Sequence, residues 1–219
     1  MIENLNAIDQ NILLAINGMH SHYLDSFMWL MSGVWAYLVV ALGFLYLSYR
    51  QGWKQMLLIM LALALTIALA DQLSSGIIKP LVQRLRPTHD AEIGSLIHLV
   101  KGYRGGLYGF VSSHAANSFG AAVLVALLFR SREVAIAMIV WAVAVSYSRM
   151  YMGVHYPGDI VCGAIIGAFS AYIFYRLFSM ASKKWALCTK FSTQDSKFMT
   201  AAIIANVCVL LIVASLFEI

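Results

Sequence analysis

Two histidines and one aspartate have the residue types and spacing for nucleophilic catalysis. His155 and Asp159 are four residues apart, which is about one helical turn and puts both side chains on one face of a helix. The carboxylate of Asp159 can then hold one ring nitrogen of His155 and leave the other free as a nucleophile. His114 can protonate a leaving alkoxide and later activate water. We therefore predict His155 as nucleophile, Asp159 as its orienting group and His114 as general acid and base.

Fixed cations near these residues indicate a phosphate substrate. A phosphate monoester carries nearly two negative charges at neutral pH, and Lys79, Arg86 and Arg149 can neutralise them. The hydroxyl of Ser112 can donate a hydrogen bond. Backbone N–H groups near Ser113, at the start of an apolar segment, suit an anion at a helix N-terminus. The pattern predicts phosphoryl transfer through a phosphohistidine, without a cofactor or metal ion.

These residues fall into three clusters, at 79–87, 111–114 and 148–159. The clusters resemble the signature motifs KxxxxxxRP, PSGH and SRxxxxxHxxxD of the type 2 phosphatidic acid phosphatase (PAP2) family. The first and third clusters match at every fixed position, whereas Val111 replaces the proline and Ser113 the glycine of the second. The resemblance covers about residues 70–175. It implies a membrane lipid phosphatase, with the same roles for the site residues as those inferred above.

Composition places the chain in the membrane class. Of its 219 residues, 61% are hydrophobic and only 11% are charged, against about a quarter charged in soluble domains. The net charge of +5 does not indicate nucleic acid binding, because the basic residues lie between apolar runs and form no patch with aromatic residues. We expect one integral membrane domain over residues 1–219.

The pattern of apolar runs predicts an all-α fold, a six-transmembrane helix bundle. Residues 2–17 repeat apolar positions at helical spacing opposite a polar face, which predicts an N-terminal interfacial helix. The six expected spans are 26–49, 55–78, 113–129, 134–152, 157–175 and 198–217. All three motif clusters then lie at the same end of the bundle.

The distribution of Lys and Arg orients the bundle. Connections at the end opposite the motifs hold nine basic residues, and the motif end holds six, of which three are assigned to phosphate. The nine are Arg50, Lys54, Arg130, Arg132, Arg176, Lys183, Lys184, Lys190 and Lys197. The end with nine is expected to be cytoplasmic. We therefore predict a protein of the bacterial inner membrane whose active site faces the periplasm.

Other polar residues receive plainer interpretations. Arg84, Lys101 and Arg104 are expected to be solvated loop charges. The remaining histidines, which lack partners at a telling spacing, are expected to be interfacial or structural: His20, His22, His89 and His98.

Three further features have two interpretations each. Asp71 lies four residues from Ser75 and eight from Lys79, so it either pairs with Lys79 or packs in the bundle. Gly163 and Gly167 favour close packing within the bundle over dimerisation. The glycine-rich connection 88–109 is either a lid over the site or an ordinary flexible loop.

The motifs recognise phosphate and leave the rest of the lipid open. Undecaprenyl diphosphate and lipid A phosphate rank first as substrates, followed by phosphatidate and phosphatidylglycerol phosphate. A transporter for an anionic lipid or phosphate is an alternative, although such a protein needs only cations and not the His–Asp pair. A vanadium haloperoxidase-like enzyme is another, and the apolar spans argue against it. The oligomeric state is not determined by the sequence.

Overall fold

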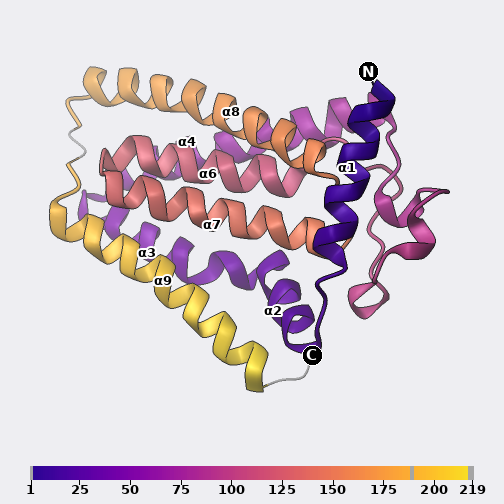
Figure 1. Cartoon of the computed structure of the whole chain (residues 1–219). Helices are drawn as coiled ribbons and strands as arrows, with labels where there is room; N and C mark the ends of the chain where they lie inside the picture. Colours follow the sequence, from indigo (N-terminus) through magenta and orange to yellow (C-terminus); the bar gives the residue numbers. More distant parts are fainter. Residues whose placement is uncertain (1, 188–189, 217–219) are drawn as a thin grey trace.

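The structure is a computed structural model that describes residues 2–187 and 190–216. Within these residues it is all-helical, as predicted, and its only β-type pairing is an isolated antiparallel bridge between Leu85 and Tyr108. Figure 1 shows long helices lying side by side, with irregular chain and one short helix gathered at one end.

The long helices account for most of the predicted spans. They are α4 (Trp53–Asp71), α6 (Ser113–Phe129), α7 (Arg132–Tyr151), α8 (Pro157–Lys184) and α9 (Thr193–Leu216). Four helices are long and apolar enough to cross a membrane, and a bent pair described below gives a fifth. Many large apolar side chains on their outer faces are exposed, for example Leu61, Ile165 and Ile212. Since water would disfavour such surfaces, the chain is an integral membrane protein. The last predicted span ended at Phe217, which lies outside the described residues.

The first predicted span is not one straight helix. Helix α2 (His22–Ser32) and helix α3 (Trp35–Arg50) meet at a bend of 44°. The backbone of Gly33 is extended and ends α2, with its N–H donating to Leu30 O. Just beyond the bend, the carbonyl of Ala36 accepts hydrogen bonds from Trp141 Nε1 at 2.9 Å and from Asn206 Nδ2 at 3.0 Å. Side chains of α7 and α9 therefore anchor the start of α3.

Helix α4 continues through a wider π-helical segment, η1 (Gln72–Ile78), into the short helix α5 (Lys79–Val82). Pro80 lacks an N–H and cannot make a regular helical bond, which suits a wide turn just before it. No hydrogen bond or ion pair joins Asp71 to Lys79 among the described residues. Asp71 instead accepts the Ser75 hydroxyl at 3.4 Å. The predicted Asp71–Lys79 pairing is therefore not a direct bond, although the charge of Asp71 still acts on Lys79.

Helices α6 and α8 pack in close contact through glycines. A Cβ atom added at Gly163 would meet the Ser112 carbonyl, and one at Gly167 would meet the Ala116 carbonyl. On α6, a Cβ at Gly120 would lie 3.4 Å from the Gly167 carbonyl oxygen. The predicted interpretation of the glycine pair as a packing site inside the bundle is correct. This contact holds the starts of α6 and α8 together, where two motif clusters lie.

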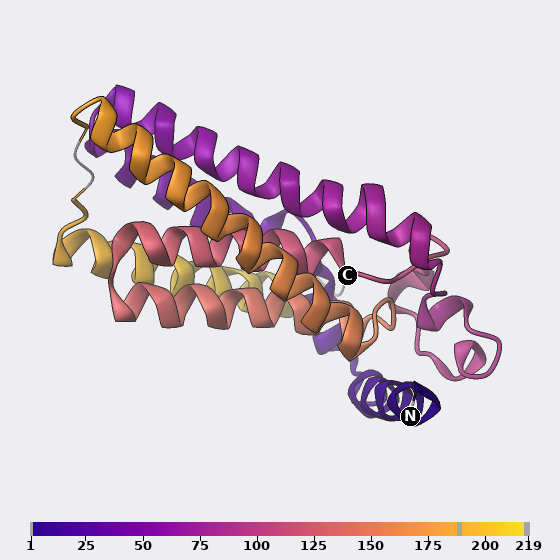
Figure 2. The same cartoon turned by 90° about the horizontal axis from the view of Figure 1, so that it is seen from above.

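The N-terminal helix α1 (Ile2–Asn17) lies across one end of the bundle, and Figures 1 and 2 show it next to the connection between α5 and α6. Its inner face includes the fully buried Leu13 and the buried Asn17, which donates to the carbonyl of Tyr151 at 2.7 Å. Its outer face exposes Leu5, Ile8 and Ile12. The helix is therefore docked on the protein by one face and presents an apolar stripe on the other.

The connection from α5 to α6 is packed over the same end. It contains three single turns of 3-10 helix, at Pro87–His89, Gly94–Leu96 and Val100–Gly102. Ile93 and Ile97 are buried against Leu13 of α1 and Tyr156. The connection thus has its own small core, which fixes the chain on either side of Arg86.

Candidate active site

His155 and Asp159 form a buried pair at the start of α8. His155 Nδ1 lies 3.3 Å from Asp159 Oδ2, and both side chains are essentially inaccessible to solvent. The sequence-based geometry was partly wrong, because His155 precedes the helix and shares no helical face with Asp159. Instead, Tyr156 is the N-cap residue, and its backbone N–H donates to Asp159 Oδ2 at 3.0 Å. Capping of α8 therefore turns the carboxylate back toward the imidazole.

Arg86 contacts the other side of the imidazole. Its Nη1 donates to His155 Nε2 at 3.0 Å and to the Val154 carbonyl at 3.1 Å. With Nε2 accepting this bond, Nδ1 carries the ring hydrogen and donates to Asp159, so the hydrogen bonds define one neutral tautomer. The nitrogen left for chemistry is Nε2.

Two glycines of the connection make room for Arg86. A Cβ at Gly105, whose φ is +68°, would lie 3.2 Å from the guanidinium carbon. A Cβ at Gly109 would lie 3.1 Å from Asp159 Oδ2 and 3.2 Å from Arg86 Cγ. These glycines allow close approach of backbone to the site, a role that neither the lid nor the flexible-loop interpretation anticipated.

Arg149 and His114 line one cavity. This cavity of about 340 Å³ lies beside the bend between α2 and α3, and its wall includes Trp29, Trp35 and Tyr103. Arg149, in the last turn of α7, is buried and donates to the Ser32 hydroxyl. His114 is half-buried in the first turn of α6. The cavity has cationic and imidazole groups at its inner end and aromatic side chains around them.

Two buried guanidinium nitrogens have no partner within the described part of the chain. They are Nε of Arg86 and Nε of Arg149. A buried donor without an acceptor is costly, and an anion between the two arginines would satisfy both.

The start of α6 supplies polar groups on the same side. Ser112 is fully buried and is the N-cap residue of α6, where its Oγ accepts from Ala115 N at 3.4 Å. Its backbone N–H donates to the carbonyl of Asp159 at 3.1 Å, which ties the starts of α6 and α8 together. The hydroxyl hydrogen of Ser112 remains available to donate. Ser113 follows as the first residue of the helix.

His155 is kept neutral by its surroundings. Burial, followed by the positive charges of Arg86, Arg149 and Lys79, lowers the pKa of His155 well below its usual range. A neutral imidazole retains the lone pair on Nε2 that a nucleophile needs. The same three cations would attract an anion toward that nitrogen.

Lys79 is the least engaged of the predicted cations. It is half-buried at the start of α5 and makes no hydrogen bond or ion pair among the residues that the structure describes. Its charge is nonetheless close enough to interact with those of Arg86, Asp71, Asp159 and Arg149. The structure thus brings all the predicted site residues to one end of the bundle.

Arg84 is the residue that sequence reasoning missed. It was expected to be a solvated loop charge, yet its Nη1 donates to Asp159 Oδ1 at 3.1 Å and its Nη2 to Asp9 Oδ2 at 3.0 Å. Its guanidinium carbon also lies 4.0 Å from the ring centroid of Tyr156. The sequence did contain a signal for this role. Arg84 lies two residues before Arg86, and residues two apart on an extended segment point to the same side.

The other plain interpretations agree with the structure. His98 Nε2 lies 2.8 Å from Asp25 Oδ2, and its ring stacks on that of His20 at 3.9 Å. Arg104 is exposed and donates only to the Thr88 carbonyl, at 3.2 Å. In residues 2–187 and 190–216, no group of three or more His, Cys, Asp or Glu residues is arranged to hold a metal ion.

Comparison with known proteins identifies the family. The family model described as PAP2 superfamily matches residues 56–183. The chain belongs to the PAP2 superfamily. The matched residues include every predicted site residue of this PAP2 protein.

Two curated relatives cover most of this PAP2 chain. It is 45% identical over 177 residues to a lipid A 4′-phosphatase of Bacteroides thetaiotaomicron, covering 80% of this chain and 79% of the relative. It is 34% identical over 187 residues to a lipid A 4′-phosphatase of Porphyromonas gingivalis, covering 84% and 78%. The fold is similar to that of Aquifex aeolicus LpxE, with a TM-score of 0.59 at 24% identity over 76% of this chain and 94% of the other. These comparisons support the predicted enzyme class, a membrane lipid phosphatase.

Proposed function

We propose that this PAP2 phosphatase removes the 4′-phosphate of lipid A. Two relatives that align with about four fifths of the chain carry that activity in their names. The sequence alone left lipid A phosphate and undecaprenyl diphosphate almost level. Because these two alignments extend over most of the chain, they favour lipid A phosphate as the substrate.

One observation carries the proposed chemistry. A neutral, buried His155 is held by Asp159, and two buried arginines beside it have unpartnered Nε groups. A phosphate between Arg86 and Arg149 would accept from both guanidinium groups and present its phosphorus to Nε2. In this position the cations stabilise the charge that develops on the equatorial oxygens during transfer.

The first chemical step forms a phosphohistidine. The lone pair on Nε2 of His155 forms a bond to phosphorus, and the bond from phosphorus to the ester oxygen breaks. The electron pair of that bond leaves on the oxygen, which takes a proton from His114. The bound phosphate anion offsets the neighbouring cations and thereby allows this imidazole to carry the proton. The imidazole becomes positively charged, and the carboxylate of Asp159 stabilises it through Nδ1–H.

The second step restores the enzyme. His114, now neutral, accepts a proton from a water molecule that attacks phosphorus. The bond between nitrogen and phosphorus breaks, and its electron pair returns to Nε2. Inorganic phosphate is released, with Lys79, Ser112 and the N–H groups at the start of α6 contributing to its binding.

For the membrane arrangement we retain six spans and an interfacial α1. The α2–α3 pair, the α4–α5 helix and helices α6 to α9 would be the spans, with the 17 residues of α6 at the short end of the usual range. The exposed stripe of Leu5, Ile8 and Ile12 supports an α1 that lies in the bilayer interface.

The charge distribution supports a site on the periplasmic side of the inner membrane. Basic residues are concentrated at the end opposite the site. The cavity of His114 and Arg149 is lined partly by Trp35, whose exposed fraction is 55%, so a lipid could approach from the bilayer.

The decisive experiment is phosphate release from a lipid panel by the purified protein in detergent. The panel contains lipid A, undecaprenyl diphosphate, phosphatidylglycerol phosphate and phosphatidate. We expect lipid A to be turned over fastest and to lose its 4′-phosphate, as identified by mass spectrometry. Preference for another lipid would reject the substrate assignment. Removal of a different phosphate would reject the position.

The matched control is His155→Ala. It should fold normally and lose turnover by at least about 10³-fold, as removal of a covalent nucleophile does elsewhere. Turnover at the wild-type rate would remove the nucleophile assignment.

A further inference from the structure

The carboxylate of Asp159 is held on both of its oxygens. Oδ2 faces His155 Nδ1 and accepts from Tyr156 N, at 3.3 Å and 3.0 Å. Oδ1 accepts from Arg84 Nη1 at 3.1 Å. The side chain of Asp159 has no accessible surface, so its charge depends on these partners rather than on water.

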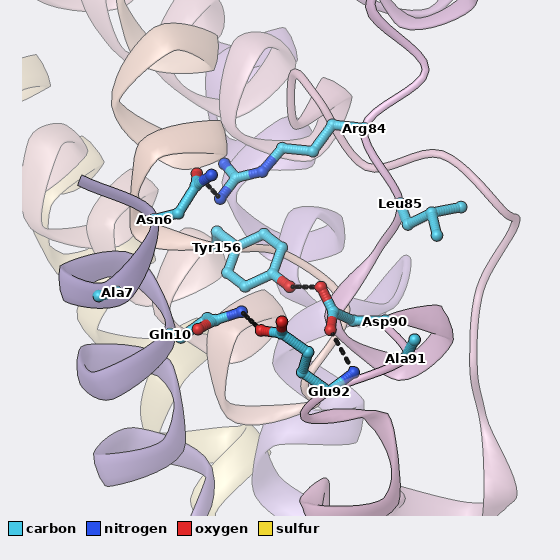
Figure 3. Close-up of a pocket in the computed structure, with 9 residues that line it drawn as sticks. All are labelled: Asn6, Ala7, Gln10, Arg84, Leu85, Asp90, Ala91, Glu92 and Tyr156. Carbon is cyan, nitrogen blue, oxygen red and sulfur yellow. Dashed lines mark hydrogen bonds between the residues drawn. The ribbon is translucent and has the colours of Figure 1, made fainter. Parts of the chain in front are cut away.

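Arg84 is itself held by several partners, and Figure 3 shows it beside Tyr156 with a 3.5 Å hydrogen bond from Nη2 to Asn6 Oδ1. It bonds Asp159 by one nitrogen and Asp9 by the other, and its plane lies over the ring of Tyr156. The Tyr156 hydroxyl is fixed in turn by a 2.9 Å hydrogen bond to Asp90. A planar guanidinium can bridge two carboxylates in fixed directions, which a flexible ammonium does less well.

Arg84 and Arg86 bond to opposite ends of the His155–Asp159 pair. The segment that carries them is extended and is pinned by two backbone bonds, from Arg86 N to Leu107 O at 3.0 Å and from Gly109 N to Arg84 O at 2.8 Å. Alternate side chains of an extended segment point to the same side. Arg84 therefore reaches the carboxylate, and Arg86 reaches Nε2 of the imidazole.

Asp9 brings the N-terminal helix into this arrangement. It lies on the face of α1 that packs on the protein, with Leu13 and Asn17 further along. Besides Arg84, it accepts the backbone N–H of Gly158 at 3.0 Å, in the first turn of α8. One carboxylate from α1 thus fixes both Arg84 and the turn that carries Asp159.

We propose that Asp9 and Arg84 are positioning residues of the active site, acting on His155 through Asp159. The proposal rests on the proposed role of His155 as nucleophile. When Nε2 bonds to phosphorus, the imidazole becomes positive, and Asp159 must be ionised and correctly turned to stabilise it. Arg84 balances the charge of the buried carboxylate and directs Oδ2 toward Nδ1, and Asp9 keeps Arg84 in place. Helix α1 is in this view part of the catalytic apparatus as well as an interfacial element.

The test compares kcat and KM for lipid A in the full-length protein. Arg84→Ala should lower kcat by about 10–100-fold. This is the usual range for a residue that orients a catalytic side chain without touching the substrate itself. Its KM should change little, because Arg84 contacts Asp159, Asp9 and Tyr156 and has no proposed contact with the phosphate. Asp9→Asn, which keeps the shape and removes the charge, should lower kcat by a smaller factor. Arg84→Lys should recover part of the loss.

A matched control separates positioning from simple docking of α1. Gln10, one residue from Asp9, also joins α1 to the connection, by a side-chain hydrogen bond of 3.4 Å to Glu92 that Figure 3 shows. Gln10→Ala should leave kcat unchanged. If Gln10→Ala lowers kcat as much as Asp9→Asn, or if the losses appear only in KM, the positioning role is rejected. Thermal unfolding of each variant identifies losses of kcat that are due to misfolding. If Arg84→Ala misfolds, the kcat values of Arg84→Lys and Asp9→Asn still test the positioning role.

Different results would reject the proposed function and the proposed positioning role. Wild-type turnover in His155→Ala would reject the proposed function and this inference together. An inactive His155→Ala with full turnover in Arg84→Ala would reject the inference alone.

Discussion

Arg86 Nη1 lies 3.0 Å from Nε2 of His155, so the proposed nucleophile and a proposed phosphate ligand are in direct contact. The guanidinium donates to the lone pair that would attack phosphorus. An incoming phosphate accepts more strongly from Arg86 than a neutral imidazole does, because the hydrogen bond is then between opposite charges. We infer that phosphate binding draws Arg86 away and frees Nε2 in the same movement. Nucleophile exposure would thereby be coupled to the arrival of substrate.

The first prediction concerns the shape of this cation. Arg86→Lys keeps the charge but loses the planar fork, so we expect kcat to fall by roughly 10²-fold, as when one preorganised transition-state donor is removed. Arg104→Lys, in the same connection but with an exposed side chain that bonds the Thr88 carbonyl, should have wild-type kinetics. Equal rates in Arg86→Lys and the wild type would mean that only the charge matters there.

The pH dependence should reflect the neutral state of His155. Protonation would remove its lone pair, so the rate falls on the acid side. Because burial and the neighbouring cations lower the pKa of His155, that fall is displaced to acid pH. In a profile of kcat/KM, the limb due to His155 should lie below about pH 6.5, the ordinary value for histidine.

Lys79→Met provides the internal check on this limb. Removing one of the three positive charges should move the His155 limb toward higher pH. The second ionisation of the phosphate, with a pKa near 6, gives a separate limb that the variant should not move. If the only acid-side fall of the wild-type rate has its midpoint above pH 6.5, a neutral His155 is contradicted.

Activity should be independent of divalent metal ions. The proposed chemistry takes its positive charge from Lys79, Arg86 and Arg149, so excess EDTA should leave the rate unchanged. A steep loss in EDTA that a divalent ion restores would indicate a metal mechanism. Vanadate, which mimics pentacoordinate phosphorus, should inhibit competitively with the lipid. Failure to inhibit would count against an in-line attack by Nε2.

The orientation can be checked by cysteine labelling. Arg104 is exposed at the active-site end, and Lys184 is exposed at the far end of α8. In a variant without Cys162, Cys188 and Cys208, a cysteine at position 104 should react with an impermeant reagent from the periplasm. One at position 184 should react only after the membrane is opened. The reverse pattern would place the site in the cytoplasm.

The sequence was sufficient for the enzyme class and for an all-helical membrane fold. Phosphoryl transfer to histidine needs few residue types, and His114, His155 and Asp159 with three cations fall at segment ends that hydropathy alone places together. The all-helical architecture follows from apolar runs, whose backbone must satisfy its own hydrogen bonds in a membrane. The family assignment confirmed the motif reading, and the individual site roles stay predictions.

Some local geometry could not be predicted from patterns. The bend at Gly33 is followed by a turn of α3 that side chains of α7 and α9 hold at Ala36, and the wide turns of η1 precede Pro80. The His155–Asp159 contact was expected, but it arises from capping at Tyr156 and not from a shared helical face. In each case the sequence pattern fits more than one backbone conformation, and tertiary contacts select among them.

Only the tertiary structure revealed Arg84 and Asp9. They lie 75 residues apart in sequence and bond each other at 3.0 Å, and no spacing rule connects them. By itself, the sequence predicted which groups do chemistry, because the candidates are restricted by their chemical type. The tertiary structure decided which groups hold them, because a supporting charge can come from any segment that folding brings within reach.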